Sequence, residues 1–123
     1  MPSPSRIVGC TIPVLPVSDE RRAIKFYTEK LGVTVDWESD TICSVSRDSC
    51  HIMLSQAVPN PGSGWVWIGL EDDSLFAEYE HREVAVVQEP RNFSWTYEMK
   101  FADPDGNVLW LGTECRDDLP RAD

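Results

Sequence analysis

The hydrophobic positions of the first half switch between strand and helix patterns. Apolar and β-branched residues over 7–17 predict a strand, and its prolines indicate a bent or edge strand, because proline cannot donate to a sheet ladder. Three further short strands are predicted over 33–38, 41–47 and 50–56. Between the first and second strands, a helix is predicted from capping residues, apolar residues at helical spacing and a closing glycine: Ser18, Asp19, Ala23, Phe26, Tyr27, Leu31 and Gly32.

The same pattern starts again after a linker. Residues 57–64 hold two prolines, two glycines and an asparagine, which is typical of a connection between packed units. Asp103-Pro-Asp-Gly-Asn107 predicts a tight turn, because proline presets φ and glycine accepts positive φ. The tail 116–123 is polar and is expected to be loose. The other predicted elements of this half are a strand over 65–70, an acidic cap over 71–73, a short helix marked by Leu75, Phe76 and Tyr79, a strand over 84–88, a loop over 90–94, and strands over 96–102 and 108–112.

Both halves therefore have the order βαβββ. Shifting the first half until Ile12 overlies Trp65 aligns strand with strand and acidic cap with acidic cap. We expect one α+β domain over residues 1–123, with half-repeats over about 6–56 and 64–113. Paired halves would form a curved mixed sheet, whose concave face is the expected ligand cleft.

Composition narrows the classes of partner. A formal net charge of −10 argues against nucleic acid and anionic membranes as partners, although an acidic surface also serves solubility. No apolar run approaches the roughly 20 residues that span a bilayer, and no secretory signal is recognisable, so a cytoplasmic location is expected. The four cysteines fit no zinc pattern and are expected to be reduced and mostly buried: Cys10, Cys43, Cys50 and Cys115.

Two segments resemble a known family. Residues 12–32, IPVLPVSDERRAIKFYTEKLG, resemble the opening of the glyoxalase/bleomycin-resistance/extradiol-dioxygenase (vicinal oxygen chelate) superfamily, and residues 101–110, FADPDGNVLW, resemble its closing signature. Within that superfamily the chain is most similar to the bleomycin-binding resistance proteins. Three features carry this similarity: the Ile-Pro-Val-Leu opening, the segment Trp65-Val-Trp-Ile68, and Trp95 in the loop before the Asp-Pro turn.

The resemblance also implies where a metal would be held. Enzymes of the superfamily hold a divalent ion with His, Gln or Glu at positions that correspond here to Ile12, Trp65 and Trp110. None of these three side chains can donate a lone pair to such an ion, so we expect no metal and no cofactor. His51 and His81 are expected to be structural, and no spacing supports a nucleophile with a base, so no catalytic residue is predicted.

The expected function is binding. Strand periodicity places Trp65 and Trp67 on one face, where they are either core residues or a stacking platform for a flat, cationic ligand. The acidic residues around Asp36 either line the site or form a solvated hairpin. By resemblance, Asp36 and Trp37 form an acidic–aromatic pair, and Ile42 stands where relatives have phenylalanine. The predicted ligand-binding residues are Asp36, Trp37, Ile42, Ser55, Trp65, Trp67, Trp95 and Trp110.

The leading hypothesis is a metal-independent protein that sequesters a bleomycin-type antibiotic. The resemblance implies a homodimer whose first strand is exchanged about Pro13, with pockets formed between the subunits. The alternatives are a metal-dependent lyase, isomerase or dioxygenase of the same superfamily, and a protein that binds another flat ligand.

Overall fold

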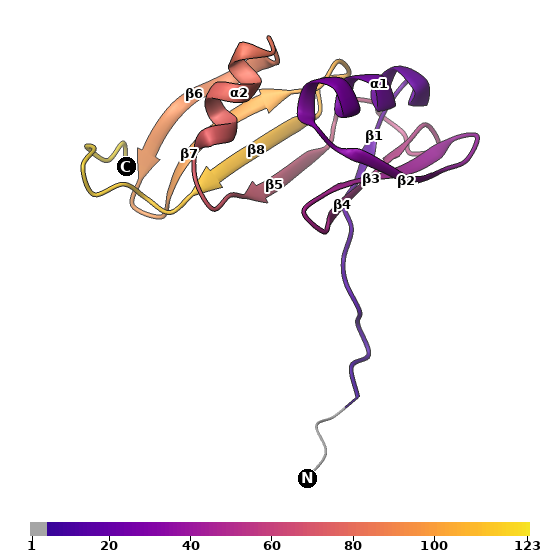
Figure 1. Ribbon diagram of the computed structural model, residues 1–123, viewed down its shortest axis with the longest axis horizontal. Helices are drawn as coiled ribbons and strands as arrows, with labels where there is room; N and C mark the ends of the chain where they lie inside the picture. Colours follow the sequence, from indigo (N-terminus) through magenta and orange to yellow (C-terminus); the bar gives the residue numbers. More distant parts are fainter. Residues whose placement is uncertain (1–4) are drawn as a thin grey trace.

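The computed structural model describes residues 5–123, and its elements follow the predicted order (Figure 1). In the first half these are β1 (Val14–Pro16), α1 (Glu20–Leu31), β2 (Thr34–Glu38), β3 (Ile42–Arg47) and β4 (Cys50–Ser55). In the second half they are β5 (Trp65–Gly69), α2 (Ser74–His81), β6 (Ala85–Phe93), β7 (Thr96–Ala102) and β8 (Val108–Thr113).

The two halves have the same topology. The first sheet has the strand order β1-β4-β3-β2 and the second has β5-β8-β7-β6. In each sheet the first strand of the half pairs in parallel with the last, and the remaining pairs are antiparallel. The predicted α+β fold with two βαβββ repeats is confirmed, and its strands form two four-stranded sheets side by side (Figure 1).

Local signals explain the limits of α1. Asp19 accepts a hydrogen bond from the Arg22 amide at 3.0 Å, as an N-cap does. Gly32 ends the helix with φ 71°, in the left-handed region that glycine adopts without a steric penalty. Between these caps, Ala23, Tyr27 and Leu31 turn one face of the helix into the core. Neither α1 nor α2 is long and apolar enough to cross a membrane.

A buried polar joint connects the halves. Asn107, which is fully buried, donates to the Pro16 carbonyl at 2.8 Å and accepts from the Gly64 amide at 2.8 Å. Asp103 accepts from three amides of its own turn and from the Tyr27 hydroxyl of α1 at 2.8 Å. Burial, together with the neighbouring Asp103 carboxylate, raises the pKa of Tyr27 well above its usual value, so the hydroxyl remains a donor at any ordinary pH.

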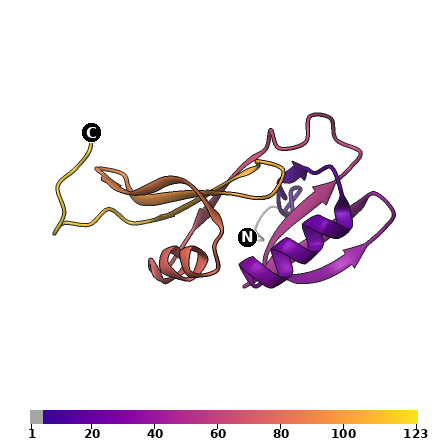
Figure 2. The same ribbon diagram turned by 90° about the horizontal axis from the view of Figure 1, so that it is seen from above.

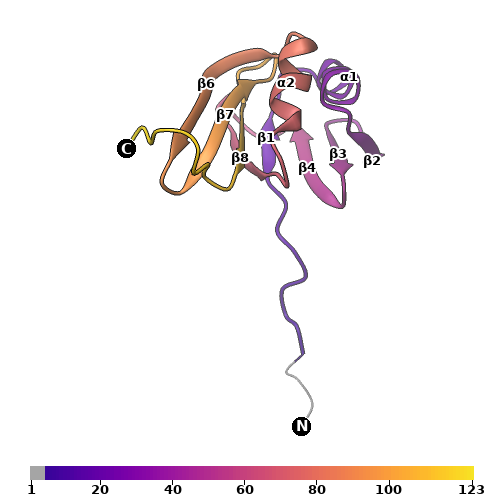
Figure 3. The same cartoon turned by 60° about the vertical axis from the view of Figure 1, so that its left-hand side comes forward.

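The first strand is much shorter than the predicted strand over 7–17. Only Val14–Pro16 are in strand register with β4, where Met53 also donates to the Pro13 carbonyl at 2.9 Å, and the residues before Ile12 leave the body of the protein as an extended arm (Figures 1 and 3). Ile7 in this arm is 96% exposed and Val8 is also exposed. The apolar pattern alone could not show that these residues have no partner within their own half.

The second correction concerns β6 and the tail. The strand expected over 84–88 and the loop expected over 90–94 form one strand, β6, that runs through Pro90. β6 is the outer strand of its sheet and pairs irregularly around Gln88, so a missing proline N–H breaks no ladder. The tail is not loose, because the Asn92 side chain donates to the Arg116 and Leu119 carbonyls.

The polar joint generates a stability prediction. Asn107→Ala leaves the Pro16 carbonyl and the Gly64 amide without this partner, and we expect it to lower the free energy of unfolding by about 3 kcal/mol. Tyr27→Phe removes one hydrogen bond while Asp103 keeps the others, so we expect a loss of about 1 kcal/mol. Urea unfolding at one fixed protein concentration measures both. Equal losses in the two variants would contradict the proposed role of Asn107.

Candidate functional site

Four tryptophans meet on the face of the second sheet that lies away from α2. In β5 the side chains alternate, so Val66 and Ile68 pack with the core while Trp65 and Trp67 point to the other face. Trp110 of β8 pairs in register with Trp67. Figure 2 shows α2 along one side of this sheet, and no helix of residues 5–123 covers the other side.

These rings form a connected cluster centred on Trp110. The ring centres of Trp67 and Trp110 are 5.2 Å apart at an interplanar angle of 90°, and Trp65 and Trp95 lie 6.3 Å and 5.9 Å from Trp110. Phe93 stacks on Trp95 at 5.6 Å. We call the set Phe93, Trp65, Trp67, Trp95 and Trp110 the aromatic cluster.

The cluster is not the hydrophobic core. Trp65 and Trp95 are each 58% exposed and Trp67 is 47% exposed, whereas core side chains of the same sheet are almost fully buried. The core interpretation of Trp65 and Trp67 is therefore wrong. Large exposed apolar side chains that touch one another are typical of binding surfaces.

Gly112 of β8 makes room for one of these indoles. The six-membered ring of Trp67 lies where a β-carbon at position 112 would stand. The outer edge of the Trp67 ring thus lies against the β8 backbone at Gly112, while about half of the side chain remains exposed. A residue without a side chain is needed here because of this close approach.

A polar group lies among the rings. Lys100 of β7 places Nζ 4.9 Å from the centre of the Trp110 ring and 5.7 Å from that of Trp65. The same Nζ donates to Gln88 Oε1 at 3.0 Å and lies 3.4 Å from Glu98 Oε2. Gln88 Nε2 in turn donates to Glu98 Oε2 at 2.9 Å.

Two buried polar atoms at this site have no hydrogen-bond partner among residues 5–123. They are Glu98 Oε1, on a side chain that is 1% exposed, and Trp110 Nε1. A buried donor or acceptor without a partner costs about 1–3 kcal/mol, so such atoms are uncommon in native proteins. Sequence reasoning missed Glu98, although two charged residues two positions apart among the apolar residues of β7 are a readable signal.

The predicted acidic site residue lies on the other sheet and is already satisfied. Asp36 accepts from Ser46 Oγ at 2.6 Å and from Ser44 Oγ at 2.9 Å, and lies 2.9 Å from His51 Nδ1. The Ser46 hydrogen bond, followed by that of His51, lowers the pKa of Asp36. Asp36 therefore remains ionised at neutral pH, with both oxygens engaged within its own sheet.

The remaining predicted residues of the first sheet do not join the aromatic cluster. Trp37 is exposed beside Asp36 in β2. Ile42 and Ser55 face each other across β3 and β4, and the buried Ser55 hydroxyl accepts from the Ala57 amide. Within one chain the predicted site is thus divided between two sheets.

The donor set does not fit a metal centre. The positions that would hold the ion carry the hydrocarbon of Ile12 and the indoles of Trp65 and Trp110, and residues 5–123 bring together no three His, Cys, Asp or Glu side chains that could hold one. The thiols are all free, as expected, but only Cys43 is buried, so the expectation of mostly buried cysteines is wrong. Burial raises the pKa of Cys43 to about 11, which leaves it an unreactive thiol.

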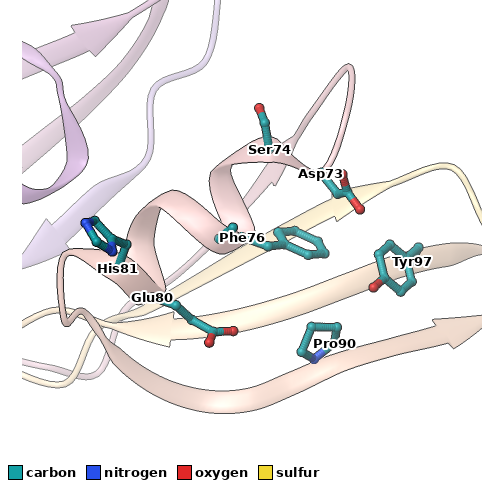
Figure 4. Close-up of a pocket in the computed structure, with 8 residues that line it drawn as sticks. Asp73, Ser74, Phe76, Glu80, His81, Pro90 and Tyr97 are labelled. Atoms are coloured by element: carbon teal, nitrogen blue, oxygen red, sulfur yellow. The ribbon is translucent and has the colours of Figure 1, made fainter.

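A hollow lies elsewhere, between α2 and the strands β6 and β7 (Figure 4). It has a volume of about 580 Å³ and contains none of the predicted site residues. Phe76 and Tyr97 in its wall pack on each other at 5.5 Å, and Arg116 lies over Tyr97 and pairs with Asp73. Because these groups already have partners, we regard the aromatic cluster as the better candidate site.

Comparison with known proteins agrees with this architecture. Residues 7–111 match the model of the Glyoxalase/Bleomycin resistance protein/Dioxygenase superfamily. No curated protein matches the chain significantly.

Several solved structures have the same fold. TnmS3, described as an antibiotic binding protein from Streptomyces sp. CB03234, is 27% identical with a TM-score of 0.78, over 89% of this chain and 99% of its own. A glyoxalase/bleomycin resistance protein from the same organism is 30% identical with a TM-score of 0.69, over 82% and 96% of the two chains. A superfamily member from Sphaerobacter thermophilus DSM 20745 is 22% identical with a TM-score of 0.74, over 89% and 100%, and shows the fold alone.

The packing of Trp67 can be tested at Gly112. Gly112→Ala places a methyl group where the indole lies, so we expect Trp67 to move and the tryptophan signals in fluorescence and near-ultraviolet circular dichroism to change. We expect a stability loss of about 1–3 kcal/mol. Gly69→Ala is the matched control, because its β-carbon meets Trp67 Nε1 at an ordinary 3.6 Å. Unchanged spectra in Gly112→Ala would contradict the described position of Trp67.

Proposed function

This chain belongs to the Glyoxalase/Bleomycin resistance protein/Dioxygenase superfamily, and on that premise we propose that it is a metal-independent binding protein for a flat aromatic antibiotic of the bleomycin type. Binding would be stoichiometric and without turnover. The protein would protect by keeping the drug from its target.

The exposed aromatic cluster is the observation that carries this proposal. Three of its indoles keep about half of their surface in water, although burying such surface is worth roughly 25 cal/mol per Å². A flat aromatic molecule inserted among Trp65, Trp67 and Trp95 would gain both burial and ring–ring contact. By resemblance, two of its rings, Trp65 and Trp110, stand where enzymes of this superfamily would need metal ligands, and the third such position is Ile12.

The comparisons support a binding role at a coarser level. TnmS3 is described as an antibiotic binding protein, and its chain is 27% identical to this one over nearly its whole length. The formal net charge of −10 adds long-range attraction for a cationic drug. We infer that the drug is sequestered in the cytoplasm, where cysteines stay reduced.

We further infer that the binding site is completed in a homodimer. The arm presents apolar residues, including Ile7 and Val8, that contact no core of their own chain, and the cluster face of the second sheet lies uncovered. A second copy could cover that face, and the arm after exchange about Pro13 would hold the two subunits together. Asp36 and Trp37 of the first sheet would then reach the aromatic cluster of the partner subunit, as the resemblance implies.

Drug binding is tested by titrating the purified protein with bleomycin while following tryptophan fluorescence and heat. We expect saturable binding at micromolar drug and about tenfold weaker binding in Trp95→Ala, which loses an exposed ring that stacks on Phe93. Val35→Ala removes an exposed apolar side chain of the first sheet and should leave binding unchanged.

Two results would defeat this function. One is a lack of saturable binding, and the other is one tightly held transition-metal ion per subunit in elemental analysis, which would favour the enzymatic alternative.

The dimer is tested by light scattering after size exclusion. We expect the wild type to run as a dimer and the double variant Ile7→Ser, Val8→Ser to dissociate at least tenfold more readily, because it loses apolar contact in the arm. The control Arg6→Ser changes a neighbouring exposed residue that is not apolar. A wild type that is monomeric at high micromolar concentration would refute the dimer.

A further inference from the structure

Asp36 and Glu98, which lie on the open faces of the first and second sheets, differ in how many of their carboxylate oxygens are paired. Asp36 has both oxygens bonded to Ser44, Ser46 and His51. Glu98 uses only Oε2, which accepts from Gln88, while its Oε1 has no partner among residues 5–123. An unpaired buried oxygen next to exposed rings is what a site retains for its ligand.

We propose that Glu98 is the specificity-determining residue of the aromatic cluster, where its Oε1 accepts a hydrogen bond from an N–H donor on the inserted edge of a flat aromatic ligand. The inference rests on the proposed function only in taking the aromatic cluster as the binding site. It adds the chemical feature by which that site selects its ligand.

The sheet register places Glu98 within the cluster. Glu98 pairs with Gly112, over whose backbone Trp67 lies, and Lys100, two residues on, pairs with Trp110. Residues two apart in a strand share a face, so Glu98 and Lys100 point to the same side as the indoles. The carboxylate is therefore beneath the rings and away from the hydrophobic core.

Lys100 determines which kind of donor fits. Its Nζ already lies 3.4 Å from Glu98 Oε2, so the carboxylate charge has a partner before any ligand arrives. The ligand thus needs to supply a hydrogen-bond donor at Oε1 and not a second full charge.

Trp110 supplies the complementary group. Its indole N–H is buried and also lacks a partner among the described residues. A ligand that carries both a donor and an acceptor could meet Glu98 Oε1 with the one and Trp110 Nε1 with the other. Sites with buried polar groups reject analogues that lack the matching group far more strongly than apolar pockets reject a changed shape.

A pair of dyes tests the donor requirement. Proflavine and acridine orange are flat tricyclic cations at pH 7 and share a protonated ring N–H, so they match in charge and in that donor. Only proflavine adds exocyclic N–H donors along its edge, because these nitrogens are dimethylated in acridine orange. We expect the wild type to bind proflavine about tenfold more tightly than acridine orange, as followed by dye fluorescence. We expect Glu98→Gln to abolish this preference, because its single acceptor oxygen is taken by Lys100 and Gln88.

The controls separate selectivity from charge and folding. Glu114→Gln removes the same charge from an exposed residue of the second half and should keep the preference. Thermal unfolding by circular dichroism establishes that each variant is folded. If Glu98→Gln does not fold, Glu98→Asp, which keeps the charge and withdraws it by one methylene, is expected to lose the preference in the same way.

The proposal is overturned if Glu98→Gln keeps the preference for proflavine, or if the wild type binds the two dyes equally or not at all. Bleomycin titration of the same samples distinguishes this from failure of the proposed function. If bleomycin binds but the dye preference does not depend on Glu98, the antibiotic function is supported and the selectivity by Glu98 is refuted. If the dye preference depends on Glu98 but bleomycin does not bind, the selectivity by Glu98 is supported and the antibiotic function is refuted.

Discussion

The fold depends on the buried polar joint around Asp103 and Asn107. Each half has one sheet and one helix, and a unit of that size buries too little surface to be stable alone. The joint links the turn before β8 to the end of β1, the linker and α1 in one set of hydrogen bonds. Gly62 permits it, because the Asp105 carbonyl stands where a β-carbon at position 62 would lie.

The buried polar joint also determines which face of each sheet stays uncovered. Because the halves meet at the turn and at the helix ends, where Tyr79 donates to the Leu31 carbonyl, the sheet faces away from the helices stay uncovered within one chain. The first sheet uses its open face for a satisfied network around Asp36. The second sheet uses its open face for rings. The two halves thus share one topology but present different side chains on their open faces, a hydrogen-bonded network on one and aromatic rings on the other.

Much of this could be predicted from the sequence because the signals are local. Asp19 and Gly32 fix the ends of α1 through capping and positive φ, and alternation in β5 gives the side on which Trp65 and Trp67 stand. What could not be predicted depends on tertiary partners. Pro90 is tolerated because β6 is an outer strand, and Asp36 is satisfied only because three side chains from β3 and β4 reach it.

The aromatic cluster lowers the stability of the folded protein, so folding alone does not explain its presence. Trp65, Trp67 and Trp95 gain little by staying half in water, and Glu98 and Trp110 each bury a polar atom that the described chain leaves unpaired. At the three exposed positions, smaller polar residues would serve folding as well. Strain and unmet hydrogen bonds persist where function requires them. The exposed indole surface and the unpaired buried polar atoms lie on one face of one sheet. A single flat ligand that carries a hydrogen-bond donor would bury that surface and pair with the Glu98 carboxylate.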